Sequence, residues 1–214
     1  MILRRDVRSG GRILTVGEIV LIRHGETEWS ASGQHTSYTD IDLTPNGEQQ
    51  ARGLAALLAG RTFAAVWCSP RLRARRTAAL AGLAPSAERA TVDEDLAEWG
   101  YGTYEGLTTA QIKAERPDWS LWTDGCPGGE TPDEVRVRLD RVLTRARAKL
   151  SDGDVALIGH GHASRVAGAR WVDLPVALAG RFYLNTASIS ELGYEHGAPV
   201  VSLWNLTAAS VKAG

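Results

Sequence analysis

The sequence predicts an α/β fold, a three-layer α/β/α sandwich in which helices cover both faces of a largely parallel central sheet. The main observation is that short apolar runs alternate with longer segments of helical periodicity through most of the 214 residues. A second observation is that these apolar runs are flanked by glycine or polar residues, as is typical of buried strands. A third is that the helical segments begin at recognisable caps.

Five apolar runs predict the strands. Three of them are expected to lie parallel in the sheet, namely residues 19–22, 64–68 and 155–159. Two later runs, residues 188–194 and 200–206, predict a hairpin that turns across residues 195–199. Because the chain has no internal repeat and no low-complexity block, we expect one domain over residues 18–214.

Two predicted helices have clear start signals. Thr44 and Pro45 are the expected N-cap and first residue of a helix that ends at Gly60. The segment from Thr131 to Glu134 predicts a capping box for a second helix, whose apolar residues keep helical spacing as far as Leu150. Shorter helices are expected at residues 72–81 and 163–171.

Composition and charge argue against several classes of partner. Lys and Arg number 24 and Asp and Glu 25, so the net charge of −1 gives no overall field that favours nucleic acid or an anionic membrane. No stretch approaches a membrane span and residues 1–17 lack a signal-peptide core, so we expect a cytoplasmic protein. Residues 1–17 are expected to be a flexible extension, and Cys68 and Cys126 to be reduced and unpaired.

Basic residues follow each of the three predicted parallel strands. Arg23 and His24 follow the first strand, Arg73 comes shortly after the second, and His160 and Gly161 follow the third. Ligands of open α/β sheets bind beyond the carboxyl ends of the strands, so we expect these residues to meet in one cleft. A cleft of this composition suits a compact, multiply charged anion.

Phosphate fits this set of residues. Two guanidinium groups grip phosphate oxygens bidentately and neutralise most of a phosphoryl dianion, so neither a metal nor another cofactor is expected. Gly25 and Gly161 are expected to let phosphate oxygens approach the backbone beside the histidines. The helix that starts after His162 is expected to offer free backbone N–H groups to the same anion.

Histidine can also supply the chemistry. A neutral imidazole on His24 can attack phosphorus in line with the leaving oxygen, and neighbouring cations should lower its pKa and keep its lone pair free. The leaving alkoxide needs a proton, for which Glu98 is the best candidate. It lies beside Trp99 and Tyr101, which could partly desolvate it and so favour a general acid.

Four segments of the chain occur in a characteristic order. They are LIRHGET at residues 21–27, SPRLRARRTA at 69–78, EWGYGTYEG at 98–106 and GHGHASR at 159–165. Together they resemble the histidine phosphatase superfamily, which includes the cofactor-dependent phosphoglycerate mutases. The resemblance implies a phosphoglycerate mutase-like fold. It also implies a phosphorylated nucleophile and a proton donor, which are His24 and Glu98, in a phosphate pocket completed by Arg23, Arg73 and His160.

Within this superfamily the residues favour a phosphatase over a mutase. A mutase must hold a second phosphate, yet residues 98–130 contain six carboxylates and only Lys113 and Arg116 as cations. Ser30 also stands where the mutases carry asparagine. The segment instead resembles mycobacterial-type acid phosphatases and fungal sedoheptulose bisphosphatases. We therefore predict a metal-independent phosphoric monoester hydrolase of the histidine acid phosphatase type, acting on sugar or other metabolite phosphates through a phosphohistidine.

Other residues are expected to contact the substrate, a small phosphorylated metabolite. They are Ser30, Thr36, Ser37, Tyr101, Gly161 and His162, of which His162 suits a structural role equally well. Four tryptophans are expected to wall the cleft, namely Trp29, Trp99, Trp119 and Trp122. Neither nucleic acid nor a membrane is an expected partner, and apolar residues near the C-terminal strands suggest a homodimer.

Three alternatives stay open on the sequence alone. The first is a cofactor-dependent phosphoglycerate mutase or an enzyme with both activities. The second is a phospho-ligand sensor without catalytic activity. The third is a zinc site made by His24, His160 and His162, which is disfavoured because adjacent arginines repel a dication and no carboxylate or thiolate has suitable spacing.

Overall fold

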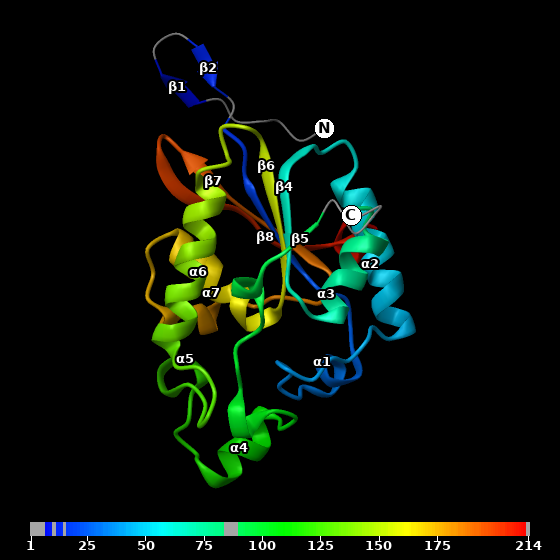
Figure 1. Cartoon of the computed structure of the whole chain (residues 1–214), viewed down its shortest axis with the longest axis vertical. Helices are drawn as coiled ribbons and strands as arrows, with labels where there is room; N and C mark the ends of the chain where they lie inside the picture. The colour runs from blue at the N-terminus through cyan, green and yellow to red at the C-terminus, as the bar shows by residue number, and fades with distance from the viewer. Residues whose placement is uncertain (1–6, 10–11, 15, 84–89, 213–214) are drawn as a thin grey trace.

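The computed structural model describes residues 7–9, 12–14, 16–83 and 90–212 of the chain, and its centre is a six-stranded sheet (Figure 1). The strand order is β5-β4-β6-β3-β7-β8. The strands are β3 (Ile19–Arg23), β4 (Phe63–Cys68), β5 (Thr91–Val92), β6 (Asp154–Gly159), β7 (Ser188–Glu195) and β8 (Ala198–Thr207). All five strands expected from the sequence are therefore present.

Parallel and antiparallel pairings divide the sheet into two parts. β5, β4, β6 and β3 pair in parallel, whereas β7 lies antiparallel to β3 and forms the predicted hairpin with β8. The expectation of a largely parallel sheet is confirmed, with the hairpin as its antiparallel edge. Because β3, β4 and β6 are adjacent and parallel, their carboxyl ends lie side by side at one edge of the sheet.

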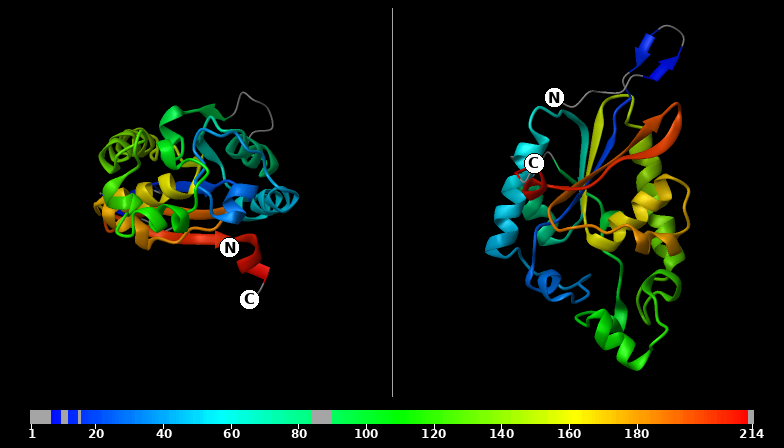
Figure 2. Two further views of the ribbon diagram at one scale, coloured as in Figure 1. Left: turned by 90° about the horizontal axis from the view of Figure 1, so that it is seen from below. Right: turned by 180° about the vertical axis from the view of Figure 1, so that it is seen from behind.

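Helices cover both faces of this sheet. α2 (Pro45–Leu58) and α3 (Leu72–Leu80) lie on one face, and α6 (Pro132–Arg147) and α7 (Gly161–Trp171) lie on the other (Figures 1 and 2). Successive residues of β3 point to opposite faces, so Ile22 packs in the core beneath α2 and α3, whereas Leu21 packs beneath α6 and α7. The three-layer sandwich predicted from the sequence is thereby confirmed.

The two long helices begin where their caps predict. The Thr44 hydroxyl accepts the Gly47 N–H at 3.0 Å. At α6 the Thr131 hydroxyl accepts the Glu134 N–H at 3.2 Å, while the Glu134 carboxylate accepts the Thr131 N–H at 2.8 Å. Their C-terminal ends were placed slightly too far along the chain, because α6 ends at Arg147 and buried Leu150 follows it.

A smaller lobe lies beyond the sheet edge at which β3, β4 and β6 end. Figure 1 shows its green ribbon at the bottom of the molecule. It contains η2 (Gly102–Tyr104), α4 (Thr109–Glu115) and α5 (Leu121–Asp124), with α1 (Glu28–Ser32) and η3 (Val176–Arg181) nearby in the fold, whereas η1 (Glu94–Leu96) packs against β6 and α6. Trp99 and Trp119 are 0% and 3% exposed in its core. The expectation that these two rings wall the cleft was wrong, because they build the lobe instead.

The chain ends contribute little to the described fold. β1 (Val7–Ser9) and β2 (Arg12–Leu14) form an antiparallel pair, and the rest of the predicted extension as far as residue 15 lies outside the described residues. α8 (Ala208–Lys212) follows β8. Of the helices in the described ranges, none has the length and apolar character needed to cross a membrane. Cys68 and Cys126 are both buried and unpaired.

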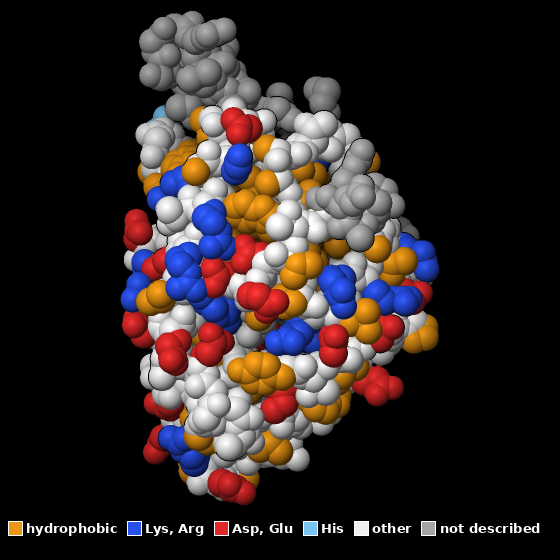
Figure 3. Space-filling view, in the orientation of Figure 1, with side chains coloured by type: hydrophobic (Ala, Val, Ile, Leu, Met, Phe, Trp, Pro, Cys, Tyr) orange, Lys and Arg blue, Asp and Glu red, His pale blue; other side chains and the backbone are white. Residues whose placement is uncertain are grey.

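The outer face of α6 is charged but balanced. Arg141 pairs with the Asp95 carboxylate at 2.5 Å, and Arg145 pairs with Asp93 at 2.5 Å and with Asp95 at 3.0 Å. Figure 3 shows basic and acidic side chains interspersed over this face of the molecule. These exposed pairs each contribute little to stability, and they leave no surplus of one sign along the helix.

Candidate active site

The loops that follow β3, β4 and β6 converge at one edge of the sheet, as the sequence predicts. The rings of His24 and His160 lie 5.2 Å apart between centroids, in an edge-to-face arrangement. Ser69, which follows β4, hydrogen bonds through Oγ to Nε2 of His160 at 2.6 Å. The backbone N–H of His24 donates to the Gly159 carbonyl at 3.0 Å. These contacts tie the three loops into one site.

His24 is held as a neutral imidazole with one nitrogen free. Its Nδ1 lies 2.7 Å from the Gly25 carbonyl, and a carbonyl only accepts, so Nδ1 carries the proton. Nε2 then keeps its lone pair. Burial, and next the charges of Arg73 and Arg23, hold the pKa of His24 well below its usual value of 6.5. The ring is therefore a competent nucleophile at neutral and mildly acidic pH.

The two arginines of the site are anchored by carbonyls rather than by carboxylates. Arg73 is 0% exposed, and its Nη1 and Nη2 donate to the carbonyls of Thr39 and Thr36, each at 3.1 Å. Nη1 of Arg23 donates to the Leu184 carbonyl at 2.5 Å. Within the described part of the chain neither arginine forms an ion pair with a carboxylate. Their positive charge is thus fixed in place and left available to an anion.

Several polar atoms of this site have no partner in the protein. Among the described residues, the buried side-chain nitrogens that lack a hydrogen-bond partner are Nε of Arg23, Arg71 and Arg73 and Nδ1 of His160. Burial lowers the pKa of both Arg23 and Arg73, while the nearby Glu98 carboxylate opposes that effect. Unpaired buried donors are costly, so a bound anion that accepts from them would stabilise the site.

Glu98 lies inside the site and caps a helix. Its Oε1 accepts the N–H groups of Trp99 at 2.9 Å and Ala163 at 2.8 Å, and its Oε2 accepts the N–H of His162 at 3.0 Å. The sequence analysis expected the N–H groups at the start of this helix to be free for phosphate. That expectation was wrong at His162 and Ala163, because α7 begins two residues earlier and Glu98 takes both donors.

Tyr101 and His162 form a neutral wall beside the site. The Tyr101 hydroxyl lies 2.6 Å from Nδ1 of His162, and burial raises the pKa of Tyr101 well above 10 while lowering that of His162 well below 6.5. The phenol therefore donates to Nδ1, and the other ring nitrogen carries the imidazole proton. The ring centroids of His35 and Trp122 lie 5.8 Å and 5.1 Å, respectively, from the ring centroid of His162. Burial lowers the pKa of His35 to about 4.

The remaining predicted substrate contacts have partners within the protein. The Ser30 hydroxyl belongs to the capping box of α1 and accepts the Thr27 N–H at 2.8 Å. Ser37 is 2% exposed, and its hydroxyl donates to Glu105 at 2.5 Å. Thr36 holds Arg73 through its carbonyl. These contacts position the site, and direct binding of substrate by the three residues stays a prediction.

The two glycines beside the histidines serve packing. A Cβ on Gly25 would lie 2.4 Å from the Gly47 carbonyl oxygen, so this glycine lets the loop pack against the start of α2. A Cβ on Gly161 would lie 3.3 Å from Cζ of Arg23, which therefore rests directly against the third loop. The sequence analysis assigned both glycines to the approach of phosphate, and that assignment stays a prediction.

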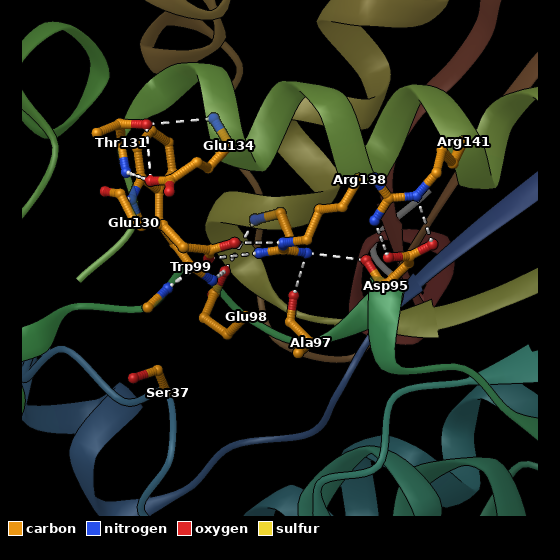
Figure 4. A network of polar contacts seen from close by, with 12 residues as sticks. Ser37, Asp95, Ala97, Glu98, Trp99, Glu130, Thr131, Glu134, Arg138 and Arg141 are labelled. Carbon is orange, nitrogen blue, oxygen red and sulfur yellow. Dashed lines mark hydrogen bonds and ion pairs between the residues drawn. The ribbon is translucent and has the colours of Figure 1, made fainter.

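Four residues with a structural part in the site were missed by the sequence analysis. Ser69 and Thr77 lie within a segment that had been recognised, and a hydroxyl directly after a strand could have singled out Ser69. The Thr77 hydroxyl accepts the Gly25 N–H at 3.0 Å and donates to the Arg73 carbonyl at 2.7 Å. Glu130 and Arg138 form an ion pair behind Glu98 (Figure 4). Glu130 is the last residue of the segment that resembles the phosphatases, whereas no motif marks Arg138.

Metal binding finds little support in this arrangement. Across the described ranges, no three or more His, Cys, Asp or Glu side chains gather as metal ligands do. Nδ1 of His162 is engaged by Tyr101, and Nε2 of His160 by Ser69. The zinc alternative from the sequence analysis is therefore disfavoured by the contacts of its own proposed ligands.

Comparisons with known proteins find a matching family model, curated relatives and solved structures. The family model for the histidine phosphatase superfamily (branch 1) matches residues 19–207. The chain is 46% identical over 195 residues to an acid phosphatase of Mycobacterium tuberculosis, which covers 88% of this chain and 92% of that protein. It is 40% identical over 186 residues to a sedoheptulose 1,7-bisphosphatase of Saccharomyces cerevisiae, covering 73% and 68% respectively. A solved structure of an M. tuberculosis open reading frame superposes with a TM-score of 0.85 at 44% identity, covering 90% of this chain and 98% of that one.

The pKa of His24 should respond to the charge of Arg73. Because the charge of Arg73 lowers the pKa of His24, replacing it in Arg73→Gln should raise that pKa toward 6.5. Ring-nitrogen NMR of labelled histidine, followed as pH is lowered, measures the change. Arg75→Gln, an exposed arginine on the same helix, is the matched control and should leave the titration of His24 where it is. An unchanged or lower pKa in Arg73→Gln would contradict the description.

Proposed function

The chain belongs to branch 1 of the histidine phosphatase superfamily, and from this premise we propose that it hydrolyses small phosphomonoesters through a phosphohistidine formed on His24. The two relatives reported above are named as an acid phosphatase and a sedoheptulose 1,7-bisphosphatase, and the chain is a phosphoric monoester hydrolase of the same kind. The observation that carries the mechanism is the free Nε2 of a neutral imidazole beside two arginines that have no carboxylate partner in the described chain.

In the proposed first step the phosphoryl group lies between Arg23, Arg73 and His160. The two guanidiniums neutralise its charge, and Nδ1 of His160 supplies a further polar contact. Nε2 of His24 attacks phosphorus in line with the ester oxygen, so a P–N bond forms as the P–O bond breaks. The alkoxide that leaves takes a proton from Glu98, which must be protonated when the substrate binds.

In the proposed second step a water molecule attacks the phosphohistidine. Glu98, now a carboxylate, accepts a proton from this water while the P–N bond breaks. Inorganic phosphate leaves, His24 returns to its neutral form and Glu98 is protonated again, so the cycle is balanced. The position of Glu98 supports this double role, because it lies at the start of the helix that follows His160, beside the proposed phosphate pocket.

The substrate class proposed is sugar phosphates and other small metabolite phosphates. The wall formed by Tyr101 and His162 is neutral and offers hydrogen-bonding groups, which suits a hydroxylated alcohol. The relative named sedoheptulose 1,7-bisphosphatase supports sugar phosphates. The mutase alternative is less favoured, because Lys113 and Arg116 are both exposed on or beside α4 and Arg116 is engaged by the Tyr104 hydroxyl at 3.0 Å.

Other expectations about the chain stay predictions. They are its cytoplasmic location, the absence of nucleic-acid and membrane partners, a homodimer, and a domain that begins at residue 18. A panel of phosphorylated metabolites, assayed side by side for hydrolysis and for phosphoryl transfer in the presence of a chelator, tests the proposed class. Product isomers that form only with a bisphosphorylated primer would favour the mutase instead.

Removal of the nucleophile gives the first prediction about turnover. His24→Ala should lower kcat by about a thousandfold or more, because no neighbouring group can accept the phosphoryl. The control is His35→Ala, which changes a buried histidine outside the phosphate pocket and should keep most of the activity. A His24→Ala variant that retains activity within about tenfold of the parent would remove His24 from the nucleophile role.

Loss of the proposed acid should depend on the leaving group. Glu98→Gln keeps the shape of the side chain but cannot supply the proton, so kcat/KM should fall by about a hundredfold for alkyl phosphates. Aryl phosphates with good leaving groups need no protonation and should lose much less. The measurement is kcat/KM, which reports every step through release of the alcohol. Equal losses for the two substrate classes would speak against the acid role.

A further inference from the structure

We propose that Arg138 is a positioning residue for Glu98 and acts together with Glu130. This proposal rests on the proposed function, in which Glu98 supplies the proton. Arg138 lies on α6, well away in sequence from each of the four segments that resemble the superfamily. It does not touch the substrate pocket itself. Its effect would be exerted on the backbone that carries Glu98 (Figure 4).

Glu98 needs such support because its own segment has no regular structure. η1 ends at Leu96 and η2 starts at Gly102, so residues 97–101 have no helix or strand to fix them. Glu98 is nevertheless only 8% exposed, and its carboxylate meets three backbone N–H groups at 2.8–3.0 Å. An irregular segment keeps that geometry only when other groups hold its backbone on both sides.

Arg138 holds the segment on the N-terminal side of Glu98. Its Nη1 donates to the carbonyls of Asp95 and Ala97, each at 2.8 Å. The other edge of the same guanidinium grips Glu130, with Nε to Oε1 at 2.7 Å and Nη2 to Oε2 at 2.9 Å. Arg138 is 8% exposed, so both interactions are largely shielded from water. Only the planar fork of arginine can make both sets of contacts at once.

Glu130 holds the segment on the C-terminal side. Its Oε2 accepts the Gly100 N–H at 2.7 Å, its backbone N–H donates to the Gly100 carbonyl at 2.8 Å, and its carbonyl accepts Nε1 of Trp99 at 2.9 Å. A Cβ on Gly100 would lie 3.4 Å from Cγ of Glu130, so the segment packs directly against Glu130 at this position. Glu98 thus lies between a backbone segment held by Arg138 and one held by Glu130, and these two residues form an ion pair with each other.

Arg138 and Glu130 together form a clamp on residues 97–101, and this clamp ties the position of the segment to a long helix. α6 has 16 residues and packs on the sheet through Val142, Leu143 and Ala146. Through Arg138 the same helix fixes the segment that presents Glu98 to the start of α7. In the proposed mechanism phosphate binding depends instead on Arg23 and Arg73, which donate to the carbonyls of Leu184 and Thr39 and not to the Glu98 segment. A loosened clamp should therefore impair proton delivery and leave the phosphate pocket intact.

The test compares leaving groups. In Arg138→Gln, kcat/KM for an alkyl phosphate such as glycerol 2-phosphate should fall by about tenfold or more, and for nitrophenyl phosphate by less than about threefold. Arg136→Gln is the matched control on the same helix, because Arg136 is exposed and pairs with Asp133 and Asp140. It should leave both values unchanged. Equal losses for the two substrates in Arg138→Gln would overturn the proposal.

A second measurement separates positioning from general destabilisation. Adding Arg138→Gln to Glu98→Gln should cost almost nothing further on the alkyl phosphate, because both changes remove one function. Additive losses would overturn the proposal. Should Arg138→Gln fail to fold, the double variant Arg138→Met with Glu130→Met removes both charges together and avoids an unpaired buried ion. This double variant should also lose more kcat/KM on the alkyl phosphate than on nitrophenyl phosphate. Equal losses on the two substrates would count against the clamp.

The proposal and the proposed function fail in distinguishable ways. If Glu98→Gln discriminates between leaving groups and Arg138→Gln does not, only the positioning role is lost. If Glu98→Gln itself slows both substrates equally, the acid role of Glu98 is wrong and the positioning role falls with it.

Discussion

The site depends on positive charge that the fold buries with no carboxylate ion-paired to it among the described residues. Arg73 is completely enclosed, and both it and Arg23 are oriented by main-chain carbonyls, which fix a guanidinium but do not neutralise it. An arginine paired with a carboxylate would offer a ligand much less net attraction. A bound dianion would offset the cost of burying these cations, and burial of the His24 ring together with their charge keeps that ring neutral.

This arrangement follows from the order of strands in the sheet. β4, β6 and β3 are consecutive neighbours, so three loops distant in sequence end within hydrogen-bond reach of one another. Small polar groups then lock the loops together, Ser69 to His160 and Thr77 to Gly25. Glu98 lies on an irregular segment, and its carboxylate reaches the same site by accepting the N–H groups of His162 and Ala163 in the first turn of α7. In the proposed mechanism, recognition of phosphate therefore resides at the sheet edge, whereas proton transfer depends on the segment that carries Glu98.

The sequence predicted the fold and the meeting of the basic loops at one sheet edge, because both follow from local patterns. Apolar runs and capping residues mark the elements, and Arg23, His24 and His160 come directly after strands. Glu98 required the resemblance to a superfamily, since a glutamate beside aromatic residues is common on surfaces. The partnership of Arg138 with the Glu98 segment could not be foreseen, because it joins a helix to a loop through tertiary contacts that leave no periodic signal.

The central claim is that His24 is transiently phosphorylated. A direct measurement mixes the enzyme with excess substrate, quenches it within the first turnovers under alkaline conditions that preserve phosphohistidine, and locates the adduct by mass spectrometry of peptides. The account predicts a phosphoryl group on His24 that is lost on acid treatment and does not form in Glu98→Gln with a poor leaving group. Turnover without an adduct on His24, or with the phosphoryl on another residue, would contradict it.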